Sequence, residues 1–308
     1  MRRSVSVFIA MTVVALLSVI GIALSQGKSE LASPNKIVHR LLADKDESKN
    51  NDAHPSSSRS QGNNGISYHG GPVMTGTTLV YYIWYGNWGG NSANTILENF
   101  ARNIGGSPYF NINTTYYNGS NVNVTNGVNY GGSTTDNYSR GTSLSDAAIQ
   151  GIVMDAINSN RLPRDPNGVY FVLTSADVDE TSGFCTVYCA WHTYGTILGT
   201  DIKYSFVGNP DRCLSGCAAQ TIGPNGNAGA DGMASLIAHE LEESVTDPDL
   251  NAWYDQRGSE NADKCAWTFG PVYQTSNGAY ANMLLGGKDY LIQRNWVNAS
   301  GGYCAISY

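Results

Sequence analysis

Three short runs of β-branched and aromatic residues lie between residues 66 and 308 and predict strands. They occupy residues 77–84 (TTLVYYIW), 169–173 (VYFVL) and 203–207. Such runs are typical of strands, and the first two are apolar enough to be buried. The segment 111–138 is rich in Asn, Gly, Thr and Tyr and predicts short strands joined by turns.

Apolar residues recur at helical spacing elsewhere in the same region. Residues 94–104, 143–158 and 231–246 predict helices, the second capped by Ser143 and the third by Asp231. The third is expected to end before a proline, which disfavours helix in the residue that precedes it. Strands and helices together predict a mixed α/β (α+β) domain.

The N-terminus has the layout of a secretory signal. Arg2 and Arg3 precede an apolar run at residues 5–24, and Ala23-Leu24-Ser25 is a small-residue cleavage site. These features predict a signal peptide over residues 1–25. A signal anchor is the alternative, because the run is about as long as the roughly 20 residues that span a bilayer.

A polar segment separates this signal from the rest of the chain. Residues 26–65 contain few apolar residues and predict a disordered stalk or pro-segment, since they cannot bury enough surface to fold. The composition changes at Ile66, and residues 66–308 follow without a second linker. That length predicts one domain with a sizeable core.

Sequons and cysteines support export. Five Asn-x-Ser/Thr sequons are candidate glycosylation sites: Asn113, Asn118, Asn123, Asn137 and Asn298. The even number of cysteines predicts disulfides in an oxidising compartment: Cys185, Cys189, Cys213, Cys217, Cys265 and Cys304.

The pairing of these cysteines is open, because six cysteines allow about 15 connectivities. The simplest connectivity closes the two short Cys-x-x-x-Cys loops and joins Cys265 to Cys304. The Cys-x-x-x-Cys pairs with His192 also resemble zinc ligands, but an oxidising compartment favours disulfides. We therefore interpret His192 as a structural histidine.

The net charge and the small fraction of charged residues argue against some classes of binding partner. The net charge is −7, and only 14% of the residues are charged. Binding to nucleic acid needs clustered Lys and Arg, which the sequence lacks, so we expect no nucleic-acid partner. After cleavage of the signal peptide we expect no membrane association either, since no other apolar segment is long enough to span a bilayer.

The third predicted helix contains the residues with the clearest chemistry. His239, Glu240 and Glu243 form a His-Glu-x-x-Glu pattern, and residues four apart share one face of a helix. Zinc peptidases use a His, a Glu as general base and a second ligand in this spacing. The pattern predicts Zn²⁺ bound by His239 and Glu243, with Glu240 as the base.

A third ligand must come from another segment. The acidic candidates are Asp247, Asp249, Glu260 and Asp263. We favour Glu260 or Asp263, because a later loop can fold back over the helix face. The alternative is that the glutamates of this helix form a solvated acidic face without a metal.

Several segments, taken in order, resemble the Exordium (phosphate-induced protein) family. The matching pieces run from about Tyr68 to Cys304 and occupy residues 68–73, 83–88, 165–170, 173–178, 184–192, 207–209, 231–233, 238–241, 251–254 and 262–265. The resemblance implies a secreted apoplastic or cell-wall protein linked to growth and cell expansion. It also implies that the His-Glu-x-x-Glu helix belongs to a single zincin-like, disulfide-braced domain with a mixed sheet.

Three hypotheses about function follow. The first is a secreted zinc-dependent hydrolase, and the second is a non-catalytic protein that binds a cell-wall glycan or an extracellular protein such as a receptor. Aromatic side chains would stack on sugars in the second case, and the candidates are Trp84, Tyr85, Trp88, Trp253 and Tyr254. Core packing is the alternative for Trp84 and Tyr85, because both lie in a predicted strand. A structural wall protein is the third hypothesis and the least favoured, since Pro-rich and Gly-rich repeats are missing.

Overall fold

The computed structural model describes residues 65–308. The predicted signal peptide (1–25) lies outside the described residues, and so does the predicted stalk or pro-segment apart from residue 65. Within the described part of the chain, no helix combines the length and the apolar character needed to cross a membrane.

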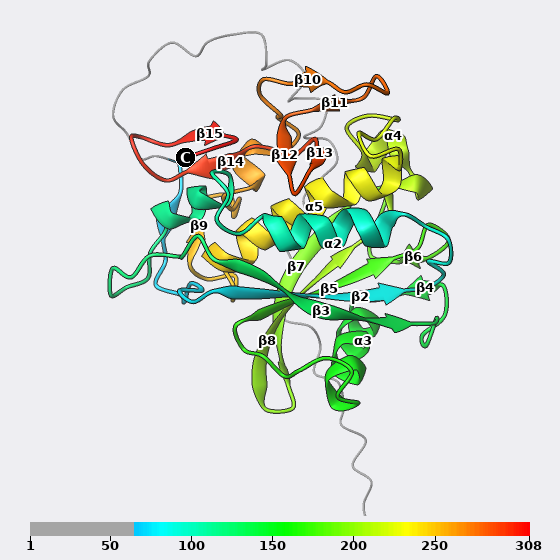
Figure 1. The fold of residues 1–308 in the computed structure, drawn as a ribbon. Coiled ribbons are helices and arrows are strands. Elements are labelled where there is room, and N and C mark those ends of the chain that lie inside the picture. The colour runs from blue at the N-terminus through cyan, green and yellow to red at the C-terminus, as the bar shows by residue number, and fades with distance from the viewer. Residues whose placement is uncertain (1–64) are drawn as a thin grey trace, which may run out of the picture. The chain divides into compact units, whose positions relative to one another are not determined.

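A five-stranded mixed sheet forms the centre of the domain (Figure 1). Its strands lie in the order β3 (Val128–Asp136), β2 (Thr78–Tyr85), β5 (Gly168–Thr174), β8 (Thr200–Val207) and β7 (Ala190–Ile197). The first four are parallel, and β7 runs antiparallel to β8 at the edge. The predicted strands are confirmed as β2, β5 and β8. Strand β7 was not predicted, because its sequence AWHTYGTI mixes apolar and polar residues without a clear period.

Three main helices cover this sheet, and the predicted helices are confirmed. Helices α2 (Ala93–Asn103) and α5 (Ala228–Thr246) lie on one face, and α3 (Asp146–Asn158) lies on the other (Figure 1). Both predicted N-caps were wrong by a few residues.

Ser145, not Ser143, caps α3, because its side chain accepts a hydrogen bond from the backbone N–H of Ala148. Ser143 belongs instead to strand β4 (Ser143–Leu144), which pairs with β6 (Asp179–Glu180). At the start of α5 the Asn227 side chain accepts from the backbone N–H of Ala230, so the helix begins before Asp231.

Small antiparallel pairs and short helices complete the domain, mostly on the side of α5 that faces away from the sheet (Figure 1). The pairs are β1 (Ser67–Tyr68) with β9 (Trp253–Tyr254), β10 (Tyr273–Gln274) with β11 (Tyr280–Ala281), β12 (Met283–Leu285) with β13 (Lys288–Tyr290), and β14 (Asn295–Val297) with β15 (Tyr303–Ala305). The short helices are η1 (Phe110–Thr115), η2 (Pro210–Arg212), α4 (Leu214–Cys217) and η3 (Asp263–Cys265).

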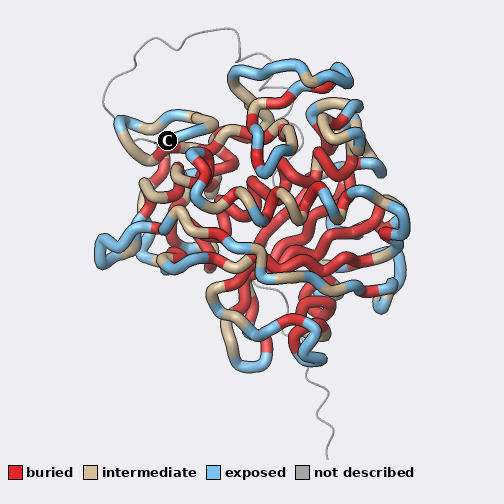
Figure 2. Tube along the Cα trace, viewed as in Figure 1, coloured by how far each residue is buried: buried red, intermediate tan, exposed pale blue. Residues whose placement is uncertain are grey.

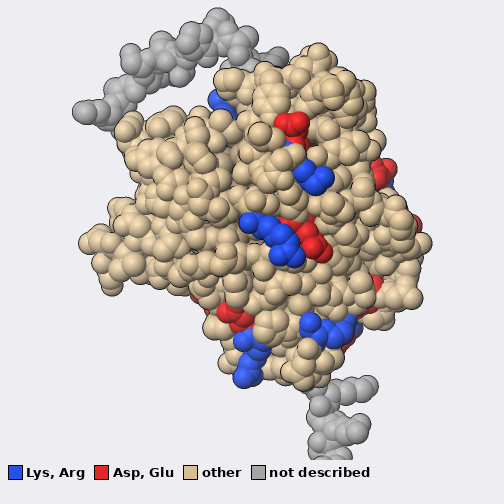
Figure 3. Space-filling view, viewed as in Figure 1, with Lys and Arg blue, Asp and Glu red and all other residues tan. Residues whose placement is uncertain are grey.

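Helix α5 is consequently buried on nearly all sides, as Figure 2 shows for the centre of the molecule. Its Glu240, Glu242 and Glu243 are 4%, 0% and 4% exposed. The alternative of a solvated acidic face is therefore wrong. Buried carboxylates need partners, because an unpaired charge in the interior costs several kcal/mol or more. The visible surface, by contrast, carries only scattered charged side chains (Figure 3).

The aromatic residues considered for sugar stacking are not exposed. Trp84, Tyr85, Trp88 and Trp253 are between 0% and 9% exposed, and they pack in the core. Tyr254 is partly buried and stacks on His69 with ring centroids 3.7 Å apart. Core packing, the alternative weighed for Trp84 and Tyr85, is thus confirmed and extends to Trp88 and Trp253.

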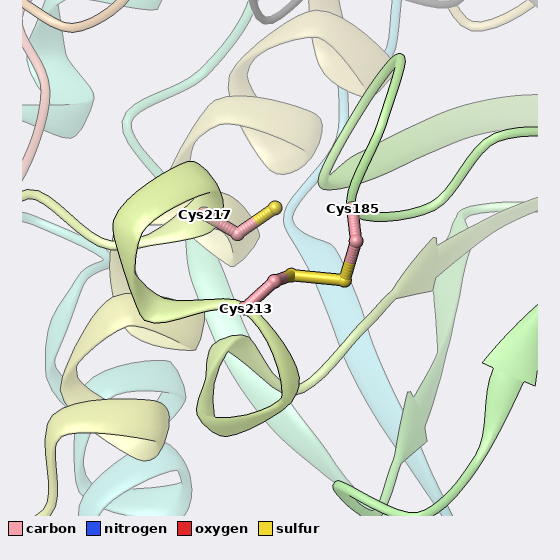
Figure 4. A group of neighbouring side chains, drawn as sticks. All are labelled: Cys185, Cys213 and Cys217. Carbon is pink, nitrogen blue, oxygen red and sulfur yellow. A yellow bond between two sulfur atoms is a disulfide. The ribbon is translucent and has the colours of Figure 1, made fainter.

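All six cysteines form disulfides, but two of the three pairs differ from the simplest connectivity. Cys265 is joined to Cys304 as expected, whereas the other bonds are Cys185–Cys213 and Cys189–Cys217. The second members of these two bonds lie four residues apart at α4, so both sulfurs can face the neighbouring 185–189 loop. Figure 4 shows Cys185 reaching Cys213 from this loop, with Cys217 one turn further along. Because these cysteines are in disulfides, their sulfurs cannot act as the thiolate ligands of a zinc cluster.

One candidate glycosylation site is inaccessible in this fold. Asn113 is 0% exposed, and its side-chain amide donates to the backbone oxygen of Phe110. A glycan on that nitrogen would have to displace core atoms, so Asn113 is corrected to a structural residue. Asn123 and Asn137 are exposed, Asn118 and Asn298 are partly exposed, and glycosylation at these four stays a prediction.

Candidate metal centre

Helix α5 places His239 and Glu243 one turn apart on the same face, as the spacing predicted. His239 Nε2 lies 3.1 Å from Glu243 Oε1, and the two residues are 8% and 4% exposed. A helix holds such a pair in register because residues four apart are neighbours along its surface.

The loop that begins at Glu260 and leads into η3 folds back over this face. Asp263 Oδ1 lies 3.5 Å from His239 Nε2, and the Asp263 backbone N–H donates to Glu243 Oε1 at 3.1 Å. The loop holds its own shape, since the Glu260 backbone N–H donates to Asp263 Oδ2 at 3.1 Å. Of the two favoured third ligands, Asp263 is therefore the one that faces His239.

Glu260 faces a different histidine. Its Oε2 lies 3.0 Å from Nε2 of His192, and Glu243 Oε2 lies 3.7 Å from the same nitrogen. His192 lies in β7, is 2% exposed, and reaches α5 because β7 is the sheet edge beside that helix. From the sequence, His192 is interpreted as a structural histidine, and no strand is predicted at residues 190–197. A predicted strand there would have made His192 a candidate ligand from the central sheet.

The remaining acidic candidates have other partners. Asp247 Oδ1 accepts hydrogen bonds from the backbone N–H groups of Asn251 and Ala252, which closes the chain after α5. Asp249 lies 3.6 Å from Lys203 Nζ. Glu242 accepts a hydrogen bond from the side-chain amide of Asn295.

Burial and mutual repulsion shift the pKa values of this cluster. Burial, together with nearby carboxylates, raises the pKa of Glu240 and of Glu260 well above the ordinary value. Burial lowers the pKa of His192 to about 3, although the Asp263 carboxylate opposes this shift. Burial also disfavours the charged His239 imidazole, but the Glu243 and Asp263 carboxylates raise its pKa well above the ordinary value. The cluster thus holds more carboxyl groups than can all be ionised in a buried environment without a compensating cation.

This arrangement has the chemistry and the spacing of a metal site. Two groups, His239–Glu243–Asp263 and His192–Glu240–Glu243, each have one ligand atom per residue within 4.8 Å of the others. Zn–N and Zn–O bonds of about 2.0–2.2 Å place tetrahedral ligands about 3.3–3.6 Å apart. The separations from His239 Nε2, 3.1 Å and 3.5 Å, are close to that spacing, so the residues could hold a metal ion.

A shallow pocket gives solvent access to one side of the cluster. His239 and Glu240 line it together with Tyr188, Leu236, Trp267 and Gln293. A second pocket along α5 shares Leu236, Trp267 and Gln293 with the first and extends toward the start of the helix. The three residues that the two pockets share are uncharged, so a neutral segment of a substrate would fit best against them.

These features define a disulfide-braced α/β domain with a buried histidine–carboxylate cluster on its central helix. The family model for the phosphate-induced protein 1 conserved region matches residues 66–299. The chain therefore belongs to the phosphate-induced protein 1 family, which includes the Exordium proteins.

Plant proteins are among its relatives. The chain is 32% identical over 251 residues to Protein EXORDIUM-like 3 of Arabidopsis thaliana, covering 71% of this chain and 73% of that protein. It is 30% identical over 273 residues to Protein EXORDIUM-like 5 of the same plant, with 75% of each chain covered. Protein PHOSPHATE-INDUCED 1 of Nicotiana tabacum is 27% identical over 223 residues, or 61% of this chain and 67% of the relative. No solved structure matches the chain.

Proposed function

We propose that this Exordium-family protein acts outside the cell as a zinc-dependent hydrolase with a zincin-like site. Three disulfides and the Exordium relatives are consistent with an extracellular protein. The N-terminal signal and the accessible sequons support secretion, with the apoplast or cell wall as the destination in a plant. A role in growth and cell expansion is part of the same proposal and rests on the family resemblance.

One observation carries the catalytic proposal: His239 Nε2 faces carboxylate oxygens of both Glu243 and Asp263 within 3.5 Å, next to a pocket. A single ring hydrogen can serve only one of those oxygens, whereas a metal ion between the three groups satisfies all of them. His239, Glu243 and Asp263 are therefore the proposed ligands, and the mixed sheet beside a His-Glu-x-x-Glu helix supports the zincin-like interpretation.

Zn²⁺ would supply Lewis acidity, which lowers the pKa of water to about 7 and polarises a carbonyl. The chain would supply the proton transfers. Glu240 follows His239 on α5 and lines the pocket, so its carboxylate can accept a proton from water and deliver it to a leaving group. The proposed substrate is an amide or ester in an extracellular protein or cell-wall polymer, bound along the uncharged wall of Trp267 and Gln293.

The test combines metal analysis with one conservative substitution. Purified protein is expected to contain zinc, and Glu240→Gln should keep the zinc while kcat falls about 10²–10⁴-fold, the usual contribution of a general base. Cleavage of a mixed peptide and ester library would be followed by mass spectrometry. Glu98→Gln, at a surface ion pair with Arg102 on α2, is the matched control.

Metal-free protein with intact disulfides would rule out this function. Equal cleavage by wild type and Glu240→Gln would instead rule out Glu240 as the base. Glycan binding through stacked aromatics is not proposed, because the aromatic residues considered for it are buried or already stacked.

A further inference from the structure

Glu243 presents its two carboxylate oxygens to two different histidines. Oε1 lies 3.1 Å from His239 Nε2, and Oε2 lies 3.7 Å from His192 Nε2. The histidines come from different elements, α5 and β7, so the helix alone does not impose this arrangement. Carboxylates placed between two such centres are suited to bridge a pair of metal ions, which lie about 3.5–4 Å apart in two-metal sites.

The second histidine has a ligand set of its own. Besides Glu243 Oε2, His192 Nε2 has Glu260 Oε2 at 3.0 Å. His192 and Glu260 are each 2% exposed. The Glu260 carboxyl also has the buried Asp247 carboxyl as a neighbour. Two adjacent buried carboxyls favour a shared proton or a cation.

Hydrogen bonding alone does not satisfy His192. Its Nε2 faces two carboxylates, and a ring hydrogen on that atom can serve only one of them. A cation between Nε2, Glu243 and Glu260 would use the nitrogen lone pair and one oxygen of each carboxylate.

The carboxyl groups around the two histidines also favour bound cations. The carboxylates that surround the two histidines are Glu240, Glu243, Glu260 and Asp263, which together carry −4 when ionised. In the interior, four carboxyl groups this close together cannot all be ionised unless cations balance them, and two divalent cations would balance these four more fully than one.

We propose that the site holds two metal ions with Glu243 as the bridging ligand. This inference rests on the proposed function for the outer ion, which His239 and Asp263 would bind beside the pocket. His192 and Glu260 would bind the inner ion, and neither residue lines the pocket. The inner ion would anchor β7 and the Glu260 loop to α5 and hold the Glu243 carboxylate in place for the outer ion.

The first measurement is the number of ions per chain. Metal-stripped protein would be titrated with Zn²⁺ under calorimetry, and the dialysed complex would be analysed by mass spectrometry for zinc and sulfur. Wild type is expected to bind two ions per chain. With Mn²⁺, the electron paramagnetic resonance spectrum should change from that of isolated ions to that of a coupled pair at the second equivalent.

Variants separate the two positions. His192→Ala and Glu260→Gln should each bind one ion and give no coupled Mn²⁺ spectrum, with the inner affinity reduced more than about 100-fold, since even outer-shell changes cost 10–100-fold. Glu243→Gln should weaken both ions. The controls are Glu98→Gln, and His69→Ala at an exposed histidine, both expected to bind two ions.

Two results would overturn the pair of ions while leaving the proposed function intact. One is a single ion per wild-type chain that is lost in His239→Ala and kept in Glu260→Gln. The other is two ions in both wild type and Glu260→Gln. Wild-type protein that binds no Zn²⁺ would overturn the proposed function and the inner ion together. Glu260→Gln is nearly isosteric, and its circular dichroism would verify that it folds.

Discussion

Asp231 in the first turn of α5 shows how one buried carboxyl couples folding to pH. Its two oxygens accept hydrogen bonds from the backbone N–H and the side-chain amide of Asn225 at 2.9 Å and 2.6 Å. Burial raises its pKa above the usual value even though these hydrogen bonds oppose the shift. The folded state therefore holds this proton more tightly than the unfolded chain does.

This difference in proton affinity makes the stability of the protein depend on pH. The stabilising contribution of Asp231 is complete below the unfolded pKa of about 4 and is lost as pH rises through the folded pKa. The unfolding free energy of wild type minus that of Asp231→Asn should thus fall as the pH rises above about 4, as measured by urea denaturation. Asp211→Asn at an exposed position is the control, and a difference that grows with pH would contradict the prediction.

His192 is the residue whose role changed most between sequence and structure. No local sequence motif marks His192 as a ligand, because its partner Glu260 is 68 residues away. The His-Glu-x-x-Glu pattern on α5, by contrast, is local and was predicted with the correct relative orientation of His239 and Glu243.

At the scale of elements, helix caps show the limits of local prediction. Two serines precede α3, and only side-chain geometry distinguishes them. Ser143 is exposed in β4, whereas Ser145 accepts from the Ala148 N–H at 3.3 Å. The pairing of β4 with β6 draws Ser143 away from the helix and leaves the cap to Ser145.

Paired substitutions test this assignment. Ser145→Ala should lower the free energy of unfolding by about 1 kcal/mol, the usual cost of losing a serine N-cap. Ser143→Ala, two residues earlier, should change it by less than about 0.5 kcal/mol, as is usual for surface positions. Urea denaturation at one pH would compare them, and equal effects would refute Ser145 as the cap.

At the scale of the whole molecule, the proposed metal site would connect three distant parts of the chain: β7, α5 and the loop from Glu260 to Asp263. The Cys265–Cys304 disulfide follows that loop directly and ties it to β15. Closing a loop of this length constrains the unfolded chain by about 4 kcal/mol in the chain-entropy model. The disulfide and a bound metal would therefore stabilise the same region of the domain.

If the proposed metal ions are bound, their removal should destabilise the whole domain. A ligand present at 1,000 times its Kd stabilises the folded state by about 4 kcal/mol. For a domain of this size, each kcal/mol corresponds to about 2–4 °C in Tm, so a strong chelator should lower the Tm by roughly 8–16 °C. Calorimetry with and without EDTA would measure this shift. Glu243→Gln should show little response, and a wild-type Tm unchanged by EDTA would contradict the prediction.

The sequence by itself determined the features that depend on neighbouring residues. These are three strands and three helices, the mixed α/β class, and the His239–Glu243 face, because backbone geometry sets periods that a short window reveals. The resemblance to the Exordium family could also be recognised from the sequence, since it rests on short motifs that occur in a fixed order along the chain.

Only the tertiary structure decided what depends on long-range packing. It selected Asp263 over Glu260 as the neighbour of His239, brought His192 from an unpredicted edge strand, exchanged two disulfide partners, and buried Asn113 and Trp253. None of these follows from local spacing, because each depends on which segments pack on the two sides of α5. The same packing excludes water from the acidic face of that helix and so turns it into a candidate metal centre.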